Sequence, residues 1–179
     1  SYLPSETLLT IYNSLILSHL QYGIILWGIK SNKLVKLQKR ALRIVTKSKY
    51  NSHTDPIFKQ LNQLKIDDIF HINEWKFYYK FEKKSLPLYF RQYNFPRQLD
   101  IHSYPTRDRH LLVIPWLRYQ TSKCSIKNRI PHIINQAPQT ILDKVQTHSL
   151  HGLVTYLKRV YISAYPLECT NPNCYICRK

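Results

Sequence analysis

The sequence predicts a mainly α-helical protein, with a thumb-like helical bundle followed by a mixed, loop-rich part that ends in a cysteine-containing tail. Through most of the first 88 residues, apolar side chains recur at three- and four-residue steps, the period of an α-helix. Residues 89–129 instead carry scattered prolines and short apolar runs, which favour loops with one or two short strands. We therefore expect a helical domain over residues 1–88 and a C-terminal extension over residues 89–179, with the Cys-rich tail at residues 165–179.

The first predicted helix begins at Pro4-Ser5-Glu6 and ends at Gly28. Proline suits a first helical turn, and an acidic residue there interacts favourably with the positive end of the helix dipole. Polar residues interrupt this apolar segment, and its longest run without a strongly polar residue is only Tyr22–Ile29. A membrane span needs about 20 mostly apolar residues, so we expect a buried core helix and no membrane contact. Tyr22-Gly23 and Trp27-Gly28 are expected to pack in the core, and no secretory signal is recognisable.

The second predicted helix covers residues 33–49 and has two distinct faces. Its apolar stripe is made of Leu34, Leu37, Ala41, Ile44 and Val45. Its basic stripe is made of Lys36, Arg40, Arg43 and Lys47, with Lys33, Lys39 and Lys49 at the edges. The apolar stripe is expected to attach this helix to the core.

The remaining helices are predicted from capping residues and apolar periodicity. Asp55 is expected to cap a helix that has Pro56 in its first turn, and Asp67 is expected to cap the next helix. The expected helices cover residues 55–61, 68–84, 131–135, 138–145 and 149–161.

The charge and the aromatic content indicate a polyanionic partner. The formal net charge is +17, and 13% of the residues are aromatic, including 14 Tyr. Such a composition favours nucleic acid over a small-molecule substrate. The sequence contains no Met and begins with Ser-Tyr-Leu, so we expect a piece of a longer reading frame.

The basic face of residues 33–49 has three interpretations. No acidic residue lies between Glu6 and Asp55, and stacked like charges repel each other, so helix stability does not explain the pattern. The face can bind the phosphates of a duplex, remain solvated, or lie on a membrane surface or a calmodulin-like partner. With four phosphate contacts, log affinity would fall against log salt concentration with a slope of about −3 to −4. Binding to duplex phosphates accounts best for the absence of acidic residues.

Three stretches carry a resemblance to a known family. They are LPSETLLTIYNSLILSHLQYGIILWG, KLVKLQKRALRIVTKSKYNSHTDPIFKQLNQLKIDDI and IHSYPTRDRHLLVIP, the last followed by the Cys-containing tail. In order and spacing they resemble the region after the catalytic palm of non-LTR (LINE-type) retrotransposon reverse transcriptases. The most specific parts are YGIILWG, LQKRALRIV and HSYPTR.

The resemblance implies a thumb domain and a C-terminal extension of an RNA-directed DNA polymerase. The expected partners are RNA and DNA as a template–primer hybrid, together with the remainder of the reverse transcriptase, inside the cell in the nucleus or cytoplasm. The family's aromatic-Ala-Asp-Asp motif is absent, and Asp67-Asp68 is expected at a helix start, so this chain should lack catalytic residues. Mg²⁺ is expected only in the palm of the parent enzyme. The alternative is a decayed fragment that acts only as a structural or protein-interaction domain.

The cysteine tail offers three of the four ligands that a structural zinc site needs. Cys169, Cys174 and Cys177 form C-x4-C-x2-C. Cys124, His148 or His151 can complete the site, and the spacing selects none of them. Free thiols and a disulfide are the alternatives.

A second candidate nucleic-acid contact lies in residues 102–118. Arg107, Arg109 and Arg118 accompany Trp116 there, and arginine with aromatic rings can clamp phosphates and stack on unpaired bases. A structural turn whose arginines cap helix ends or pair with Asp100 and Asp108 is the equal alternative.

Overall fold

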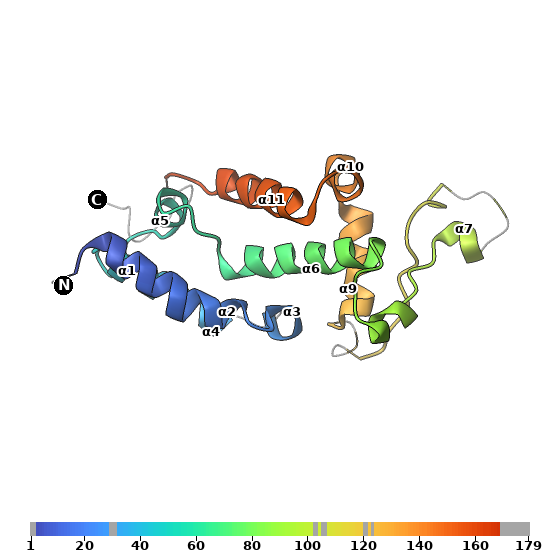
Figure 1. Ribbon diagram of the computed structural model, residues 1–179, viewed down its shortest axis with the longest axis horizontal. Coiled ribbons are helices and arrows are strands. Elements are labelled where there is room, and N and C mark those ends of the chain that lie inside the picture. Colours follow the sequence, from blue (N-terminus) through green and yellow to red (C-terminus); the bar gives the residue numbers. More distant parts are fainter. Residues whose placement is uncertain are drawn as a thin grey trace. The chain divides into compact units, whose positions relative to one another are not determined.

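The chain is mainly helical and divides into two compact units. The computed structural model describes residues 3–28, 32–101, 104, 107–119, 122 and 124–168 (Figure 1). The first unit comprises residues 1–72 and 155–179, and the second unit comprises residues 73–154. Both borders fall inside helices, α6 (Ile66–Glu82) and α11 (Leu150–Ala164). This division differs from the two consecutive domains that the sequence predicts.

The chain begins with a continuous helical segment that changes its hydrogen-bond pattern midway. α1 (Ser5–Ile11) continues into the π-helix η1 (Tyr12–Leu17) and then into α2 (Ser18–Gln21) (Figure 1). Gly23 ends it earlier than predicted, because it adopts a left-handed φ of 61° that favours a residue without Cβ. The short α3 (Ile24–Trp27) follows.

The N-terminal segment is buried on one side only. Tyr12, Leu20 and Ile24 are buried, as predicted for a core helix. The other side exposes apolar residues: Ile11, Leu15, Ile16, Tyr22 and Leu26. The core position predicted for Tyr22 is wrong, since this side chain is 85% exposed. Its backbone carbonyl accepts a hydrogen bond from Trp27 Nε1 at 2.8 Å. Among the described residues, no helix has the length and apolar character needed to span a bilayer.

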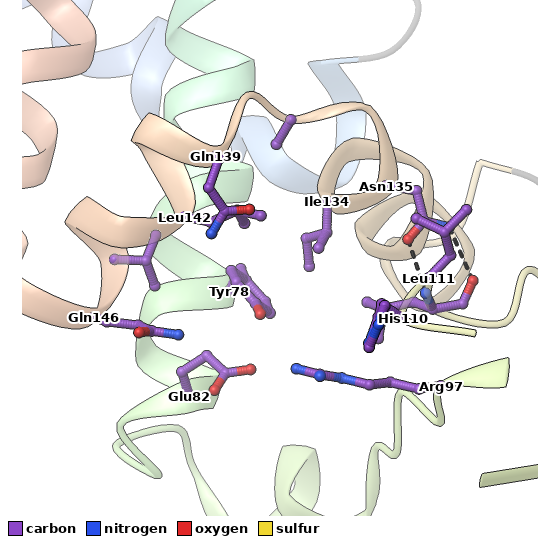
Figure 2. A pocket seen from close by; sticks show the side chains of 13 residues that line it. Tyr78, Glu82, Arg97, His110, Leu111, Ile134, Asn135, Gln139, Leu142 and Gln146 are labelled. Carbon is purple, nitrogen blue, oxygen red and sulfur yellow. Dashed lines mark hydrogen bonds between the residues drawn. The ribbon is translucent and has the colours of Figure 1, made fainter. Parts of the chain in front are cut away.

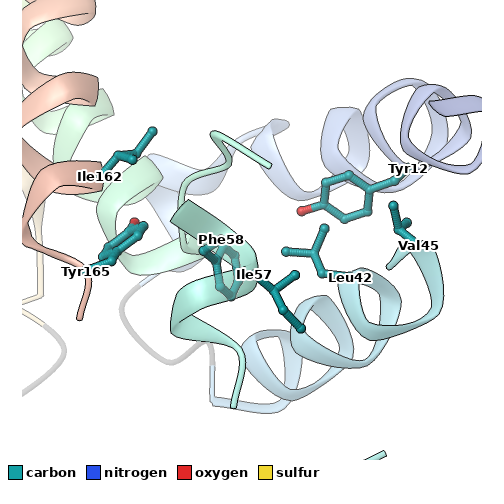
Figure 3. Close-up of a cluster of buried hydrophobic side chains, with 7 residues drawn as sticks. All are labelled: Tyr12, Leu42, Val45, Ile57, Phe58, Ile162 and Tyr165. Atoms are coloured by element: carbon teal, nitrogen blue, oxygen red, sulfur yellow. The ribbon is translucent and has the colours of Figure 1, made fainter. Parts of the chain in front are cut away.

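The core of the first unit joins segments that are far apart in the chain. It is built from the N-terminal segment, α4 (Asn32–Val45), α5 (Asp55–Gln60), α6 and the end of α11. One cluster contains Tyr12, Leu42, Val45, Ile57, Phe58, Ile162 and Tyr165 (Figure 3). A second contains Leu20, Ile24, Ile66, Ile69 and Phe70. A Cβ on Gly28 would clash with the Phe70 ring, so only a glycine allows the backbone to approach α6 this closely.

A buried glutamine connects three of these segments. Gln38 of α4 has no exposed surface. Its Nε2 donates to the Tyr12 hydroxyl at 3.0 Å and to the Leu64 carbonyl at 2.9 Å. Its Oε1 accepts the Ile66 N–H at 3.0 Å and thereby caps the first turn of α6. The amide is therefore satisfied on both its nitrogen and its oxygen, as burial of a polar group requires.

The end of α11 is attached to the start of α6 through Tyr165. The Tyr165 hydroxyl donates to the Asp68 carboxylate and accepts the Lys65 N–H at 3.0 Å. Lys65 Nζ lies 4.5 Å from the centre of the Tyr165 ring and pairs with Asp55 at 3.0 Å. Asp67 and Asp68 occupy the first turn of α6, so a helix start here is confirmed. The predicted caps are wrong, because α6 already begins at Ile66 and α5 begins at Asp55 itself, after Thr54.

We expect Asp68→Asn to stabilise the protein at neutral pH. Burial raises the pKa of Asp68 above 3.8, although the bond from Tyr165 lowers it in part. An acid with a raised pKa in the folded state reduces stability as the pH rises from about 3.8 through that raised value, because the unfolded chain ionises first. The asparagine oxygen can still accept the Tyr165 hydroxyl.

Urea unfolding of both proteins between pH 4 and pH 7 measures this effect. The advantage of Asp68→Asn should grow with pH and level off above the raised pKa. A variant less stable than the parent at pH 7 would show that the ionised carboxylate is net favourable.

The second unit combines helices with an aromatic cluster. Its elements are the C-terminal part of α6, η3 (Leu88–Gln92), α7 (Gln98–Ile101), α9 (Ile126–Gln136), α10 (Gln139–Thr147) and the start of α11. Ring pairs Phe77–Phe90, Phe81–Phe95 and Phe90–Tyr93 lie 5.4, 4.8 and 5.5 Å apart. Part of the aromatic content that suggested nucleic-acid binding is therefore packing.

Two predictions for the second unit need correction. In place of short strands, the described residues between 89 and 129 contain one isolated antiparallel bridge, Arg97 with Leu112. α9 begins at Ile126, with Pro131 inside it, whereas the sequence placed the helix start at this proline. Pro131 is buried, so its packing compensates for the helical hydrogen bond that its missing N–H cannot make.

Candidate nucleic-acid interface

The exposed side of α4 and the turn after it carry most of the predicted basic stripe. Lys33, Lys36 and Arg40 are exposed on the helix. Lys47 and Lys49 are exposed too, but they lie beyond the last helical residue, Val45. We call Lys33, Lys36, Arg40, Lys47 and Lys49 the basic face.

The turn after α4 is fixed by backbone hydrogen bonds. Ser48 N–H donates to Arg43 O at 2.9 Å and Lys47 N–H donates to Ile44 O at 3.1 Å, the pattern of a Schellman motif. Lys47 occupies the left-handed position of this motif with φ 54°. Its charge is therefore held close to the negative end of the helix dipole.

Two residues of the predicted basic stripe are less available than the sequence suggested. Arg43 is half-buried, and its Nε donates to the Ser52 carbonyl at 2.9 Å. Lys39 is also half-buried. Arg43 therefore holds the loop after α4, and the basic face consists of the other five cations.

The apolar stripe of α4 is rotated relative to the prediction. Leu37 and Ile44 were assigned to the core, and they are 58% and 57% exposed. The buried residues of α4 are Gln38, Leu42 and Val45, of which only Val45 belongs to the predicted stripe. Hydrophobic periodicity could not find this side, because the hydrogen bonds of Gln38 make a polar residue favourable in the core. Leu37 and Ile44 thus lie among the cations, where apolar contact with a partner is available.

The basic face has no acidic neighbours to neutralise it. Within the described part of the chain, none of its five cations pairs with a carboxylate. A cluster of unpaired cations with two exposed apolar side chains can attract a polyanion and contact its sugar surface.

The second predicted contact lies in the second unit. Arg107 and Arg109 are exposed in a turn, and Arg109 Nε donates to His110 Nε2 at 3.2 Å. The turn is attached to the preceding segment by Leu99 N–H to Arg109 O at 3.0 Å and Gln98 N–H to Leu111 O at 2.9 Å. Among the described residues neither arginine pairs with Asp100 or Asp108, and the Asp100 carboxylate instead accepts the Arg97 N–H at 2.7 Å. Trp116 is 86% exposed nearby in sequence.

The predicted zinc ligands Cys169, Cys174 and Cys177 lie outside the described residues. Cys124 is half-buried and carries a free thiol. In the described ranges, no group of three or more His, Cys, Asp or Glu side chains is arranged to hold a metal ion. The zinc site remains a prediction from the sequence.

Comparisons with protein-family models, with curated proteins and with solved structures find no match for this chain.

Proposed function

We propose that this chain is the nucleic-acid-binding thumb and C-terminal part of a LINE-type reverse transcriptase, without catalytic residues of its own. In this proposal the first unit is the thumb-like bundle, and its basic face holds the template–primer duplex. The observation that carries the proposal is a set of exposed cations without carboxylate partners on one side of α4 and its C-terminal turn.

The geometry of α4 suits a duplex backbone. Lys33 and Arg40 are seven residues apart, which places them about 10 Å apart along the helix axis. Lys36 lies between them on the same side, and Leu37 separates the cations with an apolar surface. Such a surface binds by charge and shape and reads no sequence, which is what a polymerase that copies any template requires.

Neutralising the exposed cations should weaken binding to an RNA–DNA hybrid. In the variant Lys36→Gln, Arg40→Gln and Lys47→Gln, three phosphate contacts are lost. Each phosphate contact contributes roughly 0.7–0.9 to the slope of log affinity against log salt concentration. This slope should therefore become shallower by about 2 to 3. Gel-shift titrations over a salt series measure the slope directly.

A matched control has the same change in net charge elsewhere. Lys80→Gln, Lys127→Gln and Arg159→Gln also remove two lysines and one arginine from exposed helical positions. This control should keep the slope of the parent chain. If both variants change the slope equally, the binding is a property of net charge, and the proposed role of α4 is wrong.

The exposed apolar side of the N-terminal segment favours a second role, attachment to the remainder of the reverse transcriptase. Leu15, Tyr22 and Leu26 are 60%, 85% and 82% exposed. Large apolar side chains exposed within one short segment favour a protein interface. As a structural or protein-interaction domain alone, the chain would use this side and would not need the basic face.

A further inference from the structure

The second unit contains a polar pocket that the basic face does not involve. Its volume is about 440 Å³, within the range of sites that bind small molecules. Figure 2 shows Tyr78 and Glu82 from α6, Arg97 and His110 from the segments joined by the β-bridge, and Gln139 and Gln146 from α10. Ile134, Leu142 and Val145 add apolar surface to its wall.

Two opposite charges face each other in this pocket. The Glu82 carboxylate and the Arg97 guanidinium point toward one another from the two sides (Figure 2). Burial and the neighbouring Glu82 raise the pKa of Tyr78, so its phenol stays protonated beside that carboxylate. The pocket therefore presents a hydrogen-bond acceptor, the Glu82 carboxylate, opposite a donor, the Arg97 guanidinium.

The backbone that carries Arg97 is held in place. Arg97 forms the β-bridge with Leu112, and its N–H donates to Asp100 Oδ2 at 2.7 Å. Asn135 of α9 bonds both backbone groups of Leu112, at 2.8 and 2.9 Å (Figure 2). The backbone at Arg97 is thus fixed before a ligand arrives, and only the side chain has to be ordered on binding.

This combination of groups is complementary to guanine. The guanine N1–H and N2–H groups can donate to one carboxylate, while O6 and N7 can accept from an arginine, the most common arginine contact to a base. Adenine, cytosine and uracil cannot donate two adjacent hydrogen bonds to Glu82 and also accept two from Arg97. The rings of Tyr78 and His110 supply surfaces on which a base can stack.

We infer that this pocket binds an unpaired guanine base through Glu82 and Arg97. The base must be unpaired because its Watson–Crick edge is used by the carboxylate. The statement that the base comes from a single-stranded part of the bound nucleic acid rests on the proposed function. The recognition of guanine rests on the pocket alone.

Isothermal titration with guanosine, adenosine, cytidine and inosine monophosphates tests the inference on the full chain. All four carry the same phosphate, so attraction to the net positive charge cancels in the comparison. Guanosine monophosphate should bind about 10-fold or more tightly than adenosine and cytidine monophosphates. Inosine monophosphate, which lacks the N2 amine, should bind with intermediate affinity.

Two substitutions assign the preference to the pocket. Glu82→Gln should weaken the guanine preference, because the amide offers one acceptor and one donor and only the Arg97 contacts to O6 and N7 remain. Glu168→Gln makes the same chemical change at an exposed position of the first unit and should retain the preference. Equal affinity for all four nucleotides, no binding of any, or a preference that Glu82→Gln leaves unchanged would each overturn the inference.

The test separates this site from the proposed function. The α4 variant Lys36→Gln, Arg40→Gln and Lys47→Gln should retain the guanine preference while its duplex salt slope decreases. A chain that prefers guanine without binding duplex contradicts the role of α4 alone, and a chain that binds duplex without preferring guanine contradicts the pocket alone.

Discussion

Glu74→Ala is expected to lower the free energy of unfolding by about 3–5 kcal/mol, the largest effect of any substitution discussed for this protein. The Glu74 side chain has no exposed surface, and the Arg129 side chain with which it pairs is 16% exposed. Removal of the carboxylate leaves a guanidinium in a site that burial already makes unfavourable for its charge, as the lowered pKa of Arg129 indicates. Urea unfolding followed by far-UV circular dichroism measures the loss.

The double variant Glu74→Met and Arg129→Met separates the cost of the unpaired charge from the value of the pair. Replacing both ions with apolar side chains of similar length should recover most of the lost stability. If the double variant is as unstable as Glu74→Ala, the loss comes from packing around α6 and not from the buried arginine. Glu168→Ala, at an exposed position, should change the stability by less than about 0.5 kcal/mol.

Gln38→Leu is expected to be the second most damaging change, with a loss of about 2–4 kcal/mol. The leucine is similar in size, but the Ile66 N–H and the Leu64 carbonyl lose their partner. Each buried polar group left unsatisfied costs about 1–3 kcal/mol. Thermal and urea unfolding would measure the loss, and the helical content of the folded state should be unchanged.

A double-mutant cycle with Tyr12→Phe tests whether the network is the cause. Tyr12→Phe alone removes the hydroxyl that accepts from Gln38, and the loss should be about 1 kcal/mol. In Gln38→Leu the hydroxyl has already lost its partner, so the two effects should not add. Strict additivity would mean that the Gln38–Tyr12 bond contributes nothing to stability.

Local features of the sequence were sufficient to predict most helices of the described residues. The predicted spans 55–61, 68–84 and 149–161 correspond to α5, α6 and α11 within a few residues at each end. Capping residues and apolar periodicity act within one or two turns of a helix, so they can be recognised without the rest of the fold. The clustering of cations in residues 33–49 is visible for the same reason.

The side of each helix that is buried could not be predicted in the same way. On α4 the deciding residue is Gln38, whose partners Tyr12 and Ile66 are 26 and 28 positions away. On the N-terminal segment, an apolar surface that includes Leu15 and Leu26 stays exposed although its composition suggested a core. Hydrophobicity alone cannot distinguish a core side from an exposed apolar side, because both have the same periodicity.

The sequence by itself determined that the protein is mainly helical, strongly basic, and rich in cations over residues 33–49. Only the tertiary structure decided that Arg43 holds a loop, that Leu37 lies on the exposed side, and that Glu82 and Arg97 face each other in a pocket. The physical reason is the range of the interactions. Helix formation depends on neighbours within a turn or two, whereas burial and the meeting of charged groups depend on partners brought together by the whole chain.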